Sequence, residues 1–201
     1  MLVTQRKKIL VVGGGGREHA LAWKLAHDSS RPEVFCAPGN AVTASVGTNL
    51  DIAATDIPKL LAWAKEHRPA LTVVGPEAPL CEGISDLFAA EGFKVFGPSR
   101  AAAQLEGSKA FAKDVMQAAG VPTAAYERFE DAVAAKAYIR KCGAPIVVKA
   151  DGLAAGKGVT VAATVEQAEA AVDEALVQKA FGDAGCSVVV EECLVGEEAS
   201  I

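Results

Sequence analysis

The 201-residue chain has no long apolar run, no CxxC cysteine pair and no excess of positive charge. A membrane-spanning helix needs about 20 consecutive apolar residues, and no run in this sequence approaches that length. The first apolar segment, Ile9 to Val12, is also too short for the core of a secretory signal peptide. These absences exclude a membrane-spanning protein and predict a soluble protein of the cytoplasm with no membrane partner.

The five cysteines are odd in number and widely spaced, at positions 36, 81, 142, 186 and 193. A disulfide framework or a structural zinc site does not fit that spacing, because each needs paired cysteines or a Cys/His cluster. We therefore expect reduced thiols and no metal site built from this chain.

Acidic residues outnumber basic ones, with 25 Asp and Glu against 20 Lys and Arg and a formal net charge of −5. This balance argues against nucleic acid as a partner, although it is compatible with a local phosphate site. A hydrophobic content of 51% is ample for a core and excludes wholesale disorder. The length predicts one domain with a smaller piece, or two small domains.

Short apolar strands alternate with helices in the first half of the chain. We expect strands at 9–12, 33–36, 71–74 and 94–96 and helices at 17–26, 57–66 and 83–90. This alternation predicts an α/β fold with an open parallel sheet and flanking helices. The strands end in GGGGRE, APGN, GPE and GPS, so these loops share the carboxyl edge of the sheet, where open α/β sheets bind ligands. Taken alone, APGN and GPS are simply typical of turns.

The pattern changes after a helix expected at 109–119, which Gly120-Val-Pro122 ends. Strands are then expected at 124–126, 146–149, 159–162 and 187–191, with helices at 131–141 and 165–180. We expect three parts: 1–122 with the linking helix, a small subdomain over 123–190, and a hinge with the first strand of a further core over 191–201. The last residues resemble the opening of another strand, so we expect the chain to be incomplete.

The first motif, Gly13 to His19, lies between a strand and a helix, where backbone amides can bind phosphate. Its spacing fails the dinucleotide pattern GxGxxG, and the second strand ends in Cys36-Ala37 where that site needs an acid. An NAD-dependent oxidoreductase is therefore disfavoured. Arg17 could add a guanidinium to a phosphate site; the alternative is an ordinary first turn of a helix.

Glu77 follows the third expected strand, in a loop that Pro76 and Pro79 stiffen. A carboxylate at this place can accept hydrogen bonds from hydroxyl groups or from an amine. The alternative is an acid favoured by the positive end of the following helix. The rigid loop favours the functional interpretation.

The second motif, IVVKADGLAAGKGV, covers residues 146–159 and joins a strand to a glycine-rich loop. It is not a Walker A loop, because only three residues separate Gly152 from Gly156 and because Gly158 replaces the Ser or Thr that would hold magnesium. Lys149 on a buried strand needs an anion, and a nucleotide phosphate is the natural partner, with the loop as a lid. The alternative is a lysine that reaches solvent beside a hairpin.

The third motif, VVVEECLVGEE, runs from an apolar strand into four carboxylates over residues 188–198. Adenine recognition needs an acceptor for the amino group, a backbone donor for a ring nitrogen and an acid for the ribose hydroxyls. Glu191 or Glu192, Leu194 and Glu198 could supply these in order. Alone the motif is weak, since acidic strand ends are common.

Together these segments resemble the ATP-grasp superfamily and, more narrowly, the phosphoribosylamine–glycine ligase family. The resemblance rests on VVGGGGREHALAWKL, APGN, VVGPEAPL, FGPS, LEGSKAFAKD, GVPTA, VVKADGLAAGKGV and VVVEECLVGEEAS, and it covers Lys8 to Ile201. It implies a Rossmann-like pre-ATP-grasp domain over 1–122, an ATP-grasp lid over 123–190 and part of the ATP-grasp core. It also implies that ATP phosphorylates glycine and that the amine of 5-phosphoribosylamine attacks the glycyl phosphate, giving glycinamide ribonucleotide, ADP and phosphate.

The resemblance also implies roles for individual positions. Lys109 and Lys149 match lysines at the nucleotide phosphates, and Glu191, Glu192 and Leu194 match contacts to adenine. Glu198 matches the ribose acid. The lid loop matches Gly152, Ala155, Gly156, Lys157 and Gly158, and the loops facing the amine substrate match Gly15, Gly16, Arg17, Pro38, Gly39, Asn40 and Glu77. No residue is assigned a catalytic role.

Family members are about twice as long, so the resemblance implies that the ligands for Mg²⁺ (or Mn²⁺) lie beyond residue 201. We therefore expect the 201 residues alone to be inactive, or to bind nucleotide weakly, as a monomer or weak dimer. Two alternatives stay open: another ATP-grasp ligase of purine synthesis, and a non-catalytic nucleotide-binding module.

Overall fold

The computed structural model describes residues 6–154, 156–197 and 199, and the chain forms two compact units, residues 1–103 and 104–201. This division precedes the 122/123 boundary expected from the sequence, because helix α6 (Lys109–Ala118) belongs to the second unit. The first residues of α6 are bonded to Asp151 of that unit, through the amides of Lys109 and Ala110. The finer division at 190/191 stays a prediction.

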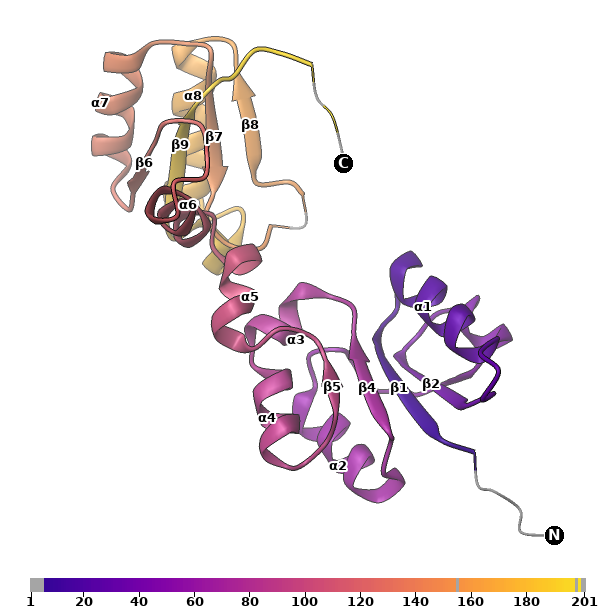
Figure 1. Cartoon of the computed structure of the whole chain (residues 1–201). Coiled ribbons are helices and arrows are strands. Elements are labelled where there is room, and N and C mark those ends of the chain that lie inside the picture. Colours follow the sequence, from indigo (N-terminus) through magenta and orange to yellow (C-terminus); the bar gives the residue numbers. More distant parts are fainter. Residues whose placement is uncertain (1–5, 155, 198, 200–201) are drawn as a thin grey trace, which may run out of the picture. The chain divides into compact units, whose positions relative to one another are not determined.

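The first unit contains a five-stranded parallel sheet with the strand order β3-β2-β1-β4-β5, as the alternating pattern predicts (Figure 1). The sequence did not reveal the two-residue strand β3, helix α3 or helix α5, which crosses the boundary between the units. The elements in chain order are β1 (Lys8–Gly13), α1 (Gly16–Ala26), β2 (Glu33–Pro38), β3 (Thr48–Asn49), α2 (Ile57–His67), β4 (Leu71–Val74), α3 (Glu77–Cys81), α4 (Ile84–Ala90), β5 (Val95–Phe96) and α5 (Arg100–Gly107).

Alternate residues of β1 belong to two different cores. Leu10 and Val12 are fully buried among residues of α2, α3 and α4, whereas Val11 packs with Ala22 of α1 on the other face. Because both faces are covered, the strand is apolar throughout, as is typical of parallel sheets. Because β1, β2 and β4 run parallel to one another, the loops that follow them lie at the same edge of the sheet.

The second unit contains a four-stranded antiparallel sheet with the order β6-β9-β7-β8. Its first strand lies at residues 126–129 rather than at 124–126, and the helix expected at 165–180 ends at Val172 and continues as a π-helical turn over 173–177. The elements after α6 are β6 (Tyr126–Phe129), α7 (Ala132–Cys142), β7 (Ile146–Ala150), β8 (Val159–Ala162), α8 (Val165–Val172), the π turn (Asp173–Val177), a 3-10 turn (Gly182–Gly185) and β9 (Val188–Glu192).

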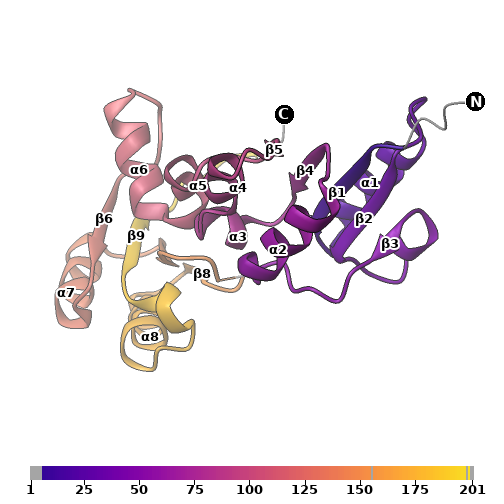
Figure 2. The same ribbon diagram turned by 90° about the horizontal axis from the view of Figure 1, so that it is seen from below.

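Helices α7 and α8 cover one face of this sheet, and α6 lies on the other side (Figure 2). Ser108 begins α6 by accepting a hydrogen bond from the Phe111 amide, and Asp131 begins α7 in the same way at Ala134. Val148 and Val190 are buried under α7 and α8, so their neighbours Lys149 and Glu191 belong to the opposite face. Within the described ranges, no helix is long and apolar enough to cross a membrane.

Candidate functional site

The carboxylate of Glu18 holds the glycine-rich loop after β1. Its Oε2 accepts a hydrogen bond from the Gly15 amide at 2.6 Å, and the residue is only 4% exposed. A Cβ at Gly75, in the loop after β4, would lie 2.6 Å from Cδ of Glu18, and a Cβ at Gly13 would lie 2.8 Å from it. Glycine at both positions therefore makes room for this carboxylate. The sequence showed Glu18 only as a residue of a first helical turn.

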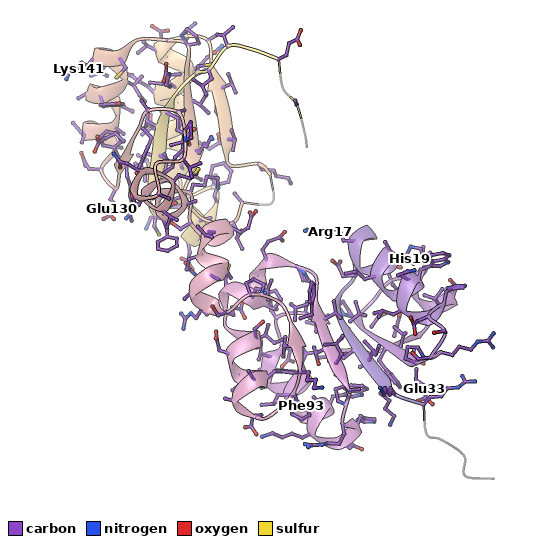
Figure 3. The ribbon with its side chains drawn as sticks, in the orientation of Figure 1. Arg17, His19, Glu33, Phe93, Glu130 and Lys141 are labelled. Atoms are coloured by element: carbon purple, nitrogen blue, oxygen red, sulfur yellow. The ribbon has the colours of Figure 1, made fainter. Side chains whose placement is uncertain are left out.

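Arg17 and Glu77 form an exposed ion pair that connects the loop after β1 with the loop after β4. Nη2 of Arg17 lies 2.9 Å from Oε1 of Glu77, and Figure 3 shows Arg17 at the start of α1. The hydrogen bond from Arg17 lowers the pKa of Glu77 below its ordinary value. Glu77 therefore stays a carboxylate, available to an amine or hydroxyl group. The two predicted residues meet across a separation of 60 positions.

Asn40 holds the loop after β2 rather than presenting a free side chain. Its Nδ2 donates to the Gly14 carbonyl at 2.9 Å, while its Oδ1 accepts from the amides of Val42 and Thr43. The Gly39 amide donates to the Gly13 carbonyl. The structure thus brings the predicted positions of the first unit together at one sheet edge, namely Gly15, Gly16, Arg17, Pro38, Gly39, Asn40 and Glu77.

In the second unit, Lys149 of β7 and Glu191 of β9 form an ion pair on the sheet face opposite α7 and α8. Nζ of Lys149 lies 2.8 Å from Oε2 of Glu191, with side-chain exposures of 27% and 6% respectively. Oε1 of Glu191 is buried and has no hydrogen-bond partner among the described residues. A buried carboxylate oxygen without a donor is costly, so this arrangement fits a ligand that brings an N–H group.

Lys113 of α6 contacts the same carboxylate, with Nζ 3.2 Å from Oε2 of Glu191. Sequence reasoning missed this residue. A signal was present, because Lys113 lies four positions after Lys109 and therefore on the same side of a helix.

Asp151 fixes the start of α6 to the glycine-rich loop. Its Oδ1 accepts from the Ala110 amide at 2.8 Å and from the Ser108 hydroxyl at 3.1 Å, and its Oδ2 accepts from Ser187 at 3.0 Å. Nζ of Lys109 donates to the Gly152 carbonyl at 3.0 Å. Burial lowers the pKa of Lys109, and the nearby ammonium of Lys149 lowers it further.

The remaining predicted positions of the second unit belong to the glycine-rich loop or follow Glu191 in the chain. Gly152 and Gly158 lie in close contacts, because a Cβ would come within 2.7 Å of Ala184 Cα and of Ala154 Cβ respectively. Lys157, Glu192 and Leu194 are exposed, and Gly156 has a φ of 78°. Ala155 and Glu198 lie outside the described residues.

The cationic groups suit a phosphate ligand better than a metal ion. Lys113 and Lys149 both contact the Glu191 carboxylate, and Lys109 contacts the carbonyl of Gly152 in the glycine-rich loop. The described part of the chain holds no group of three or more His, Cys, Asp or Glu residues that could bind a metal. These residues therefore do not by themselves fit Mg²⁺ or Mn²⁺.

In a comparison with known proteins, two models of one protein family match successive halves of the chain. A family model described as "Phosphoribosylglycinamide synthetase, N domain" matches residues 7–106, and one described as "Phosphoribosylglycinamide synthetase, ATP-grasp (A) domain" matches residues 107–201. A phosphoribosylamine–glycine ligase of Yersinia pestis is 59% identical over 194 residues, which cover 96% of this chain and 45% of that protein. The ligase of Escherichia coli K12 is 58% identical over 195 residues, with 96% and 46% covered. The chain thus spans just under half the length of these curated relatives.

Solved structures agree with this result. The phosphoribosylamine–glycine ligase of Thermotoga maritima is 33% identical with a TM-score of 0.77, and the match covers 94% of this chain and 44% of that one. A biotin carboxylase of Campylobacter jejuni, 24% identical with a TM-score of 0.69 over 95% of this chain and 46% of that one, shares the fold. Because the two family models together account for residues 7–201 in order, the chain belongs to the phosphoribosylglycinamide synthetase family.

Proposed function

We propose that this chain carries the nucleotide-phosphate site and the amine-substrate loops for ATP-dependent ligation of glycine to 5-phosphoribosylamine. The observation that carries the proposal is a pair of lysine contacts in the second unit. Nζ of Lys149 lies 2.8 Å from Oε2 of Glu191, and Nζ of Lys109 lies 3.0 Å from the carbonyl oxygen of Gly152 in the glycine-rich loop. Identity of 58–59% to curated ligases supports the choice of substrates. As a metabolic ligase, the protein would act in the cytoplasm, as a monomer or weak dimer, on small molecules.

The proposed chemistry has two steps. A carboxylate oxygen of glycine attacks the γ-phosphorus of ATP, the bond to the bridging oxygen breaks, and ADP leaves. The amine nitrogen of 5-phosphoribosylamine then attacks the carbonyl carbon of glycyl phosphate, loses a proton and expels phosphate, which gives glycinamide ribonucleotide. Lys109 and Lys149 offset the negative charge that gathers on the transferred group, since such reactions depend mainly on charge neutralisation and positioning.

Each predicted position has a role in this proposal. Glu191 accepts from the adenine amino group, Glu192 and Leu194 offer backbone contacts to the ring, and Glu198 binds the ribose. The loop over 152–158, including Ala155 and Lys157, covers the phosphates. At the first unit's sheet edge, Arg17 and Glu77 face the amine substrate together with the glycine-rich and APGN loops. The described residues do not fit Mg²⁺ or Mn²⁺, so no step is assigned to the metal ion.

Calorimetric titration with ATP and a phosphate-release assay test the proposal. For the 201 residues alone we expect weak ATP binding that needs the phosphates, and little or no phosphate release with glycine and 5-phosphoribosylamine; substantial turnover would contradict this expectation. Release with bicarbonate or formate in place of glycine would instead indicate another ATP-grasp ligase. ATP binding with no binding of 5-phosphoribosylamine would indicate a nucleotide-binding module.

A further inference from the structure

Lys113 is a buried cation that contacts the carboxylate of Glu191. The residue is 6% exposed, and its ammonium lies 2.7 Å from Oγ1 of Thr123 and 3.2 Å from the carbonyl oxygen of Ala124. It also lies 3.2 Å from Oε2 of Glu191 and 5.5 Å from the centre of the Tyr126 ring. A lysine is rarely buried so deeply unless an anion pairs with its charge.

The two carboxylate oxygens of Glu191 differ in their contacts. Oε2 receives the ammonium groups of both Lys113 and Lys149, at 3.2 and 2.8 Å. Oε1 is buried, and among the described residues it receives no donor. The two lysines approach from different elements, α6 and β7, so together they prevent the carboxylate from turning. The remaining oxygen is left as a hydrogen-bond acceptor that a ligand can use.

We propose that Lys113 is a positioning residue that aims Oε1 of Glu191 at the ligand and so sets a preference for a nucleobase with an exocyclic amino group. This inference rests on the nucleotide-binding function proposed above and deepens it. A purine with an amino group at C6 donates to Oε1, whereas a purine with a carbonyl group there meets the carboxylate with a second acceptor. Sites built to pair with a donor reject the analogue that lacks it, because a buried polar group is then left unpaired.

The test compares binding of ATP and of inosine triphosphate, which carries a carbonyl group at C6. We expect the unmodified chain to bind ATP at least tenfold more tightly, since one hydrogen bond to a charged group contributes about that factor. The substitution Lys113→Met should reduce this preference to about threefold or less, mainly by weakening ATP binding. Lys113→Arg, which keeps the charge, should retain most of the preference.

Lys136→Met is the matched control. Lys136 forms an ion pair with Asp173 at 2.7 Å in the same unit but in the helical layer, so its loss should lower stability and leave the nucleotide preference unchanged. If Lys113→Met does not fold, Thr123→Val removes the 2.7 Å bond to the same ammonium and should weaken ATP binding more than inosine triphosphate binding.

The outcomes separate the two proposals. An unmodified chain that binds neither triphosphate would overturn the proposed function, and the inference with it. An unmodified chain that prefers ATP, with variants at positions 113 and 123 that keep the full preference, would overturn only the role of Lys113, which would then be a structural lysine.

Discussion

The ammonium of Lys149 lies 2.8 Å from Oε2 of Glu191, although 42 positions separate the two residues in the chain. Strands β7 and β9 are antiparallel neighbours, and Lys149 stands opposite Val189 while Glu191 stands opposite Val147. Since alternate residues of a strand share a face, this register places both side chains on the same face as diagonal neighbours. The ion pair is therefore a consequence of strand register.

Removing the Lys109 ammonium should weaken binding of phosphates specifically. Lys109→Met is expected to lower the affinity for ATP about 10- to 100-fold, because a charge-assisted hydrogen bond is worth about 1.5–3 kcal/mol. Affinity for adenosine should stay within about twofold. Lys141→Met, at the exposed last turn of α7 (Figure 3), is the control for a lost surface lysine. Calorimetric titration measures both ligands, and an equal loss for ATP and adenosine would contradict the assigned role.

Gly75→Ala should destabilise the first unit through its contact with Glu18. The new Cβ would lie 2.6 Å from Cδ of Glu18, so the carboxylate must shift at a cost of about 1–3 kcal/mol in the free energy of unfolding. Adding Glu18→Ala should recover part of that cost, because the clashing atoms are gone.

Gly16→Ala is the matched control for that substitution. A Cβ at Gly16 meets no atom within 4 Å, and this residue begins α1, where alanine is the better helix former. Chemical denaturation should therefore find the variant at least as stable as the unmodified chain. A similar loss for both glycine variants would show that the Glu18 contact is not the cause.

Asp151 should show a graded response to substitution. Asp151→Ala removes the acceptor for the Ala110 amide and for two serine hydroxyls, so we expect a loss of about 2–4 kcal/mol in the free energy of unfolding. Asp151→Asn keeps the shape and one oxygen, and a hydroxyl can turn to accept, so its loss should be about half as large. Denaturation of both variants measures the difference. Equal losses would indicate that the charge rather than the hydrogen bonds matters.

Tyr126 should ionise only at high pH. Its hydroxyl donates to Oδ1 of Asp114 at 2.6 Å, and this bond raises its pKa to about 12 from the ordinary value of 10.0. Because the folded state holds the proton more tightly, the stabilisation is fully present below pH 10 and is lost as the pH rises toward 12. In a Tyr138→Phe background, ultraviolet titration should follow Tyr126 alone, and Asp114→Asn should move its pKa back toward 10. An unchanged titration would contradict the role of Asp114.

The fold class was predictable because its signals are local. The apolar runs Ile9 to Val12 and Leu71 to Val74, each followed by a glycine, indicate buried parallel strands without knowledge of any partner. The edge strand β3 was not predictable, because two exposed residues carry no pattern. The π turn after Val172 was hidden for a related reason, since its residues continue an ordinary helical sequence.

Residue patterns alone predicted the parallel sheet, the loops at its carboxyl edge, the family, and which lysines and glutamates are candidates for a nucleotide site. Which of these groups lie in contact depends on the fold. Burial of Lys113 against Glu191, the space beside Gly75 that Glu18 fills and the use of Asn40 as a loop anchor each join residues distant in the chain. Such contacts depend on strand register and on close packing between elements, which no local pattern of residues encodes.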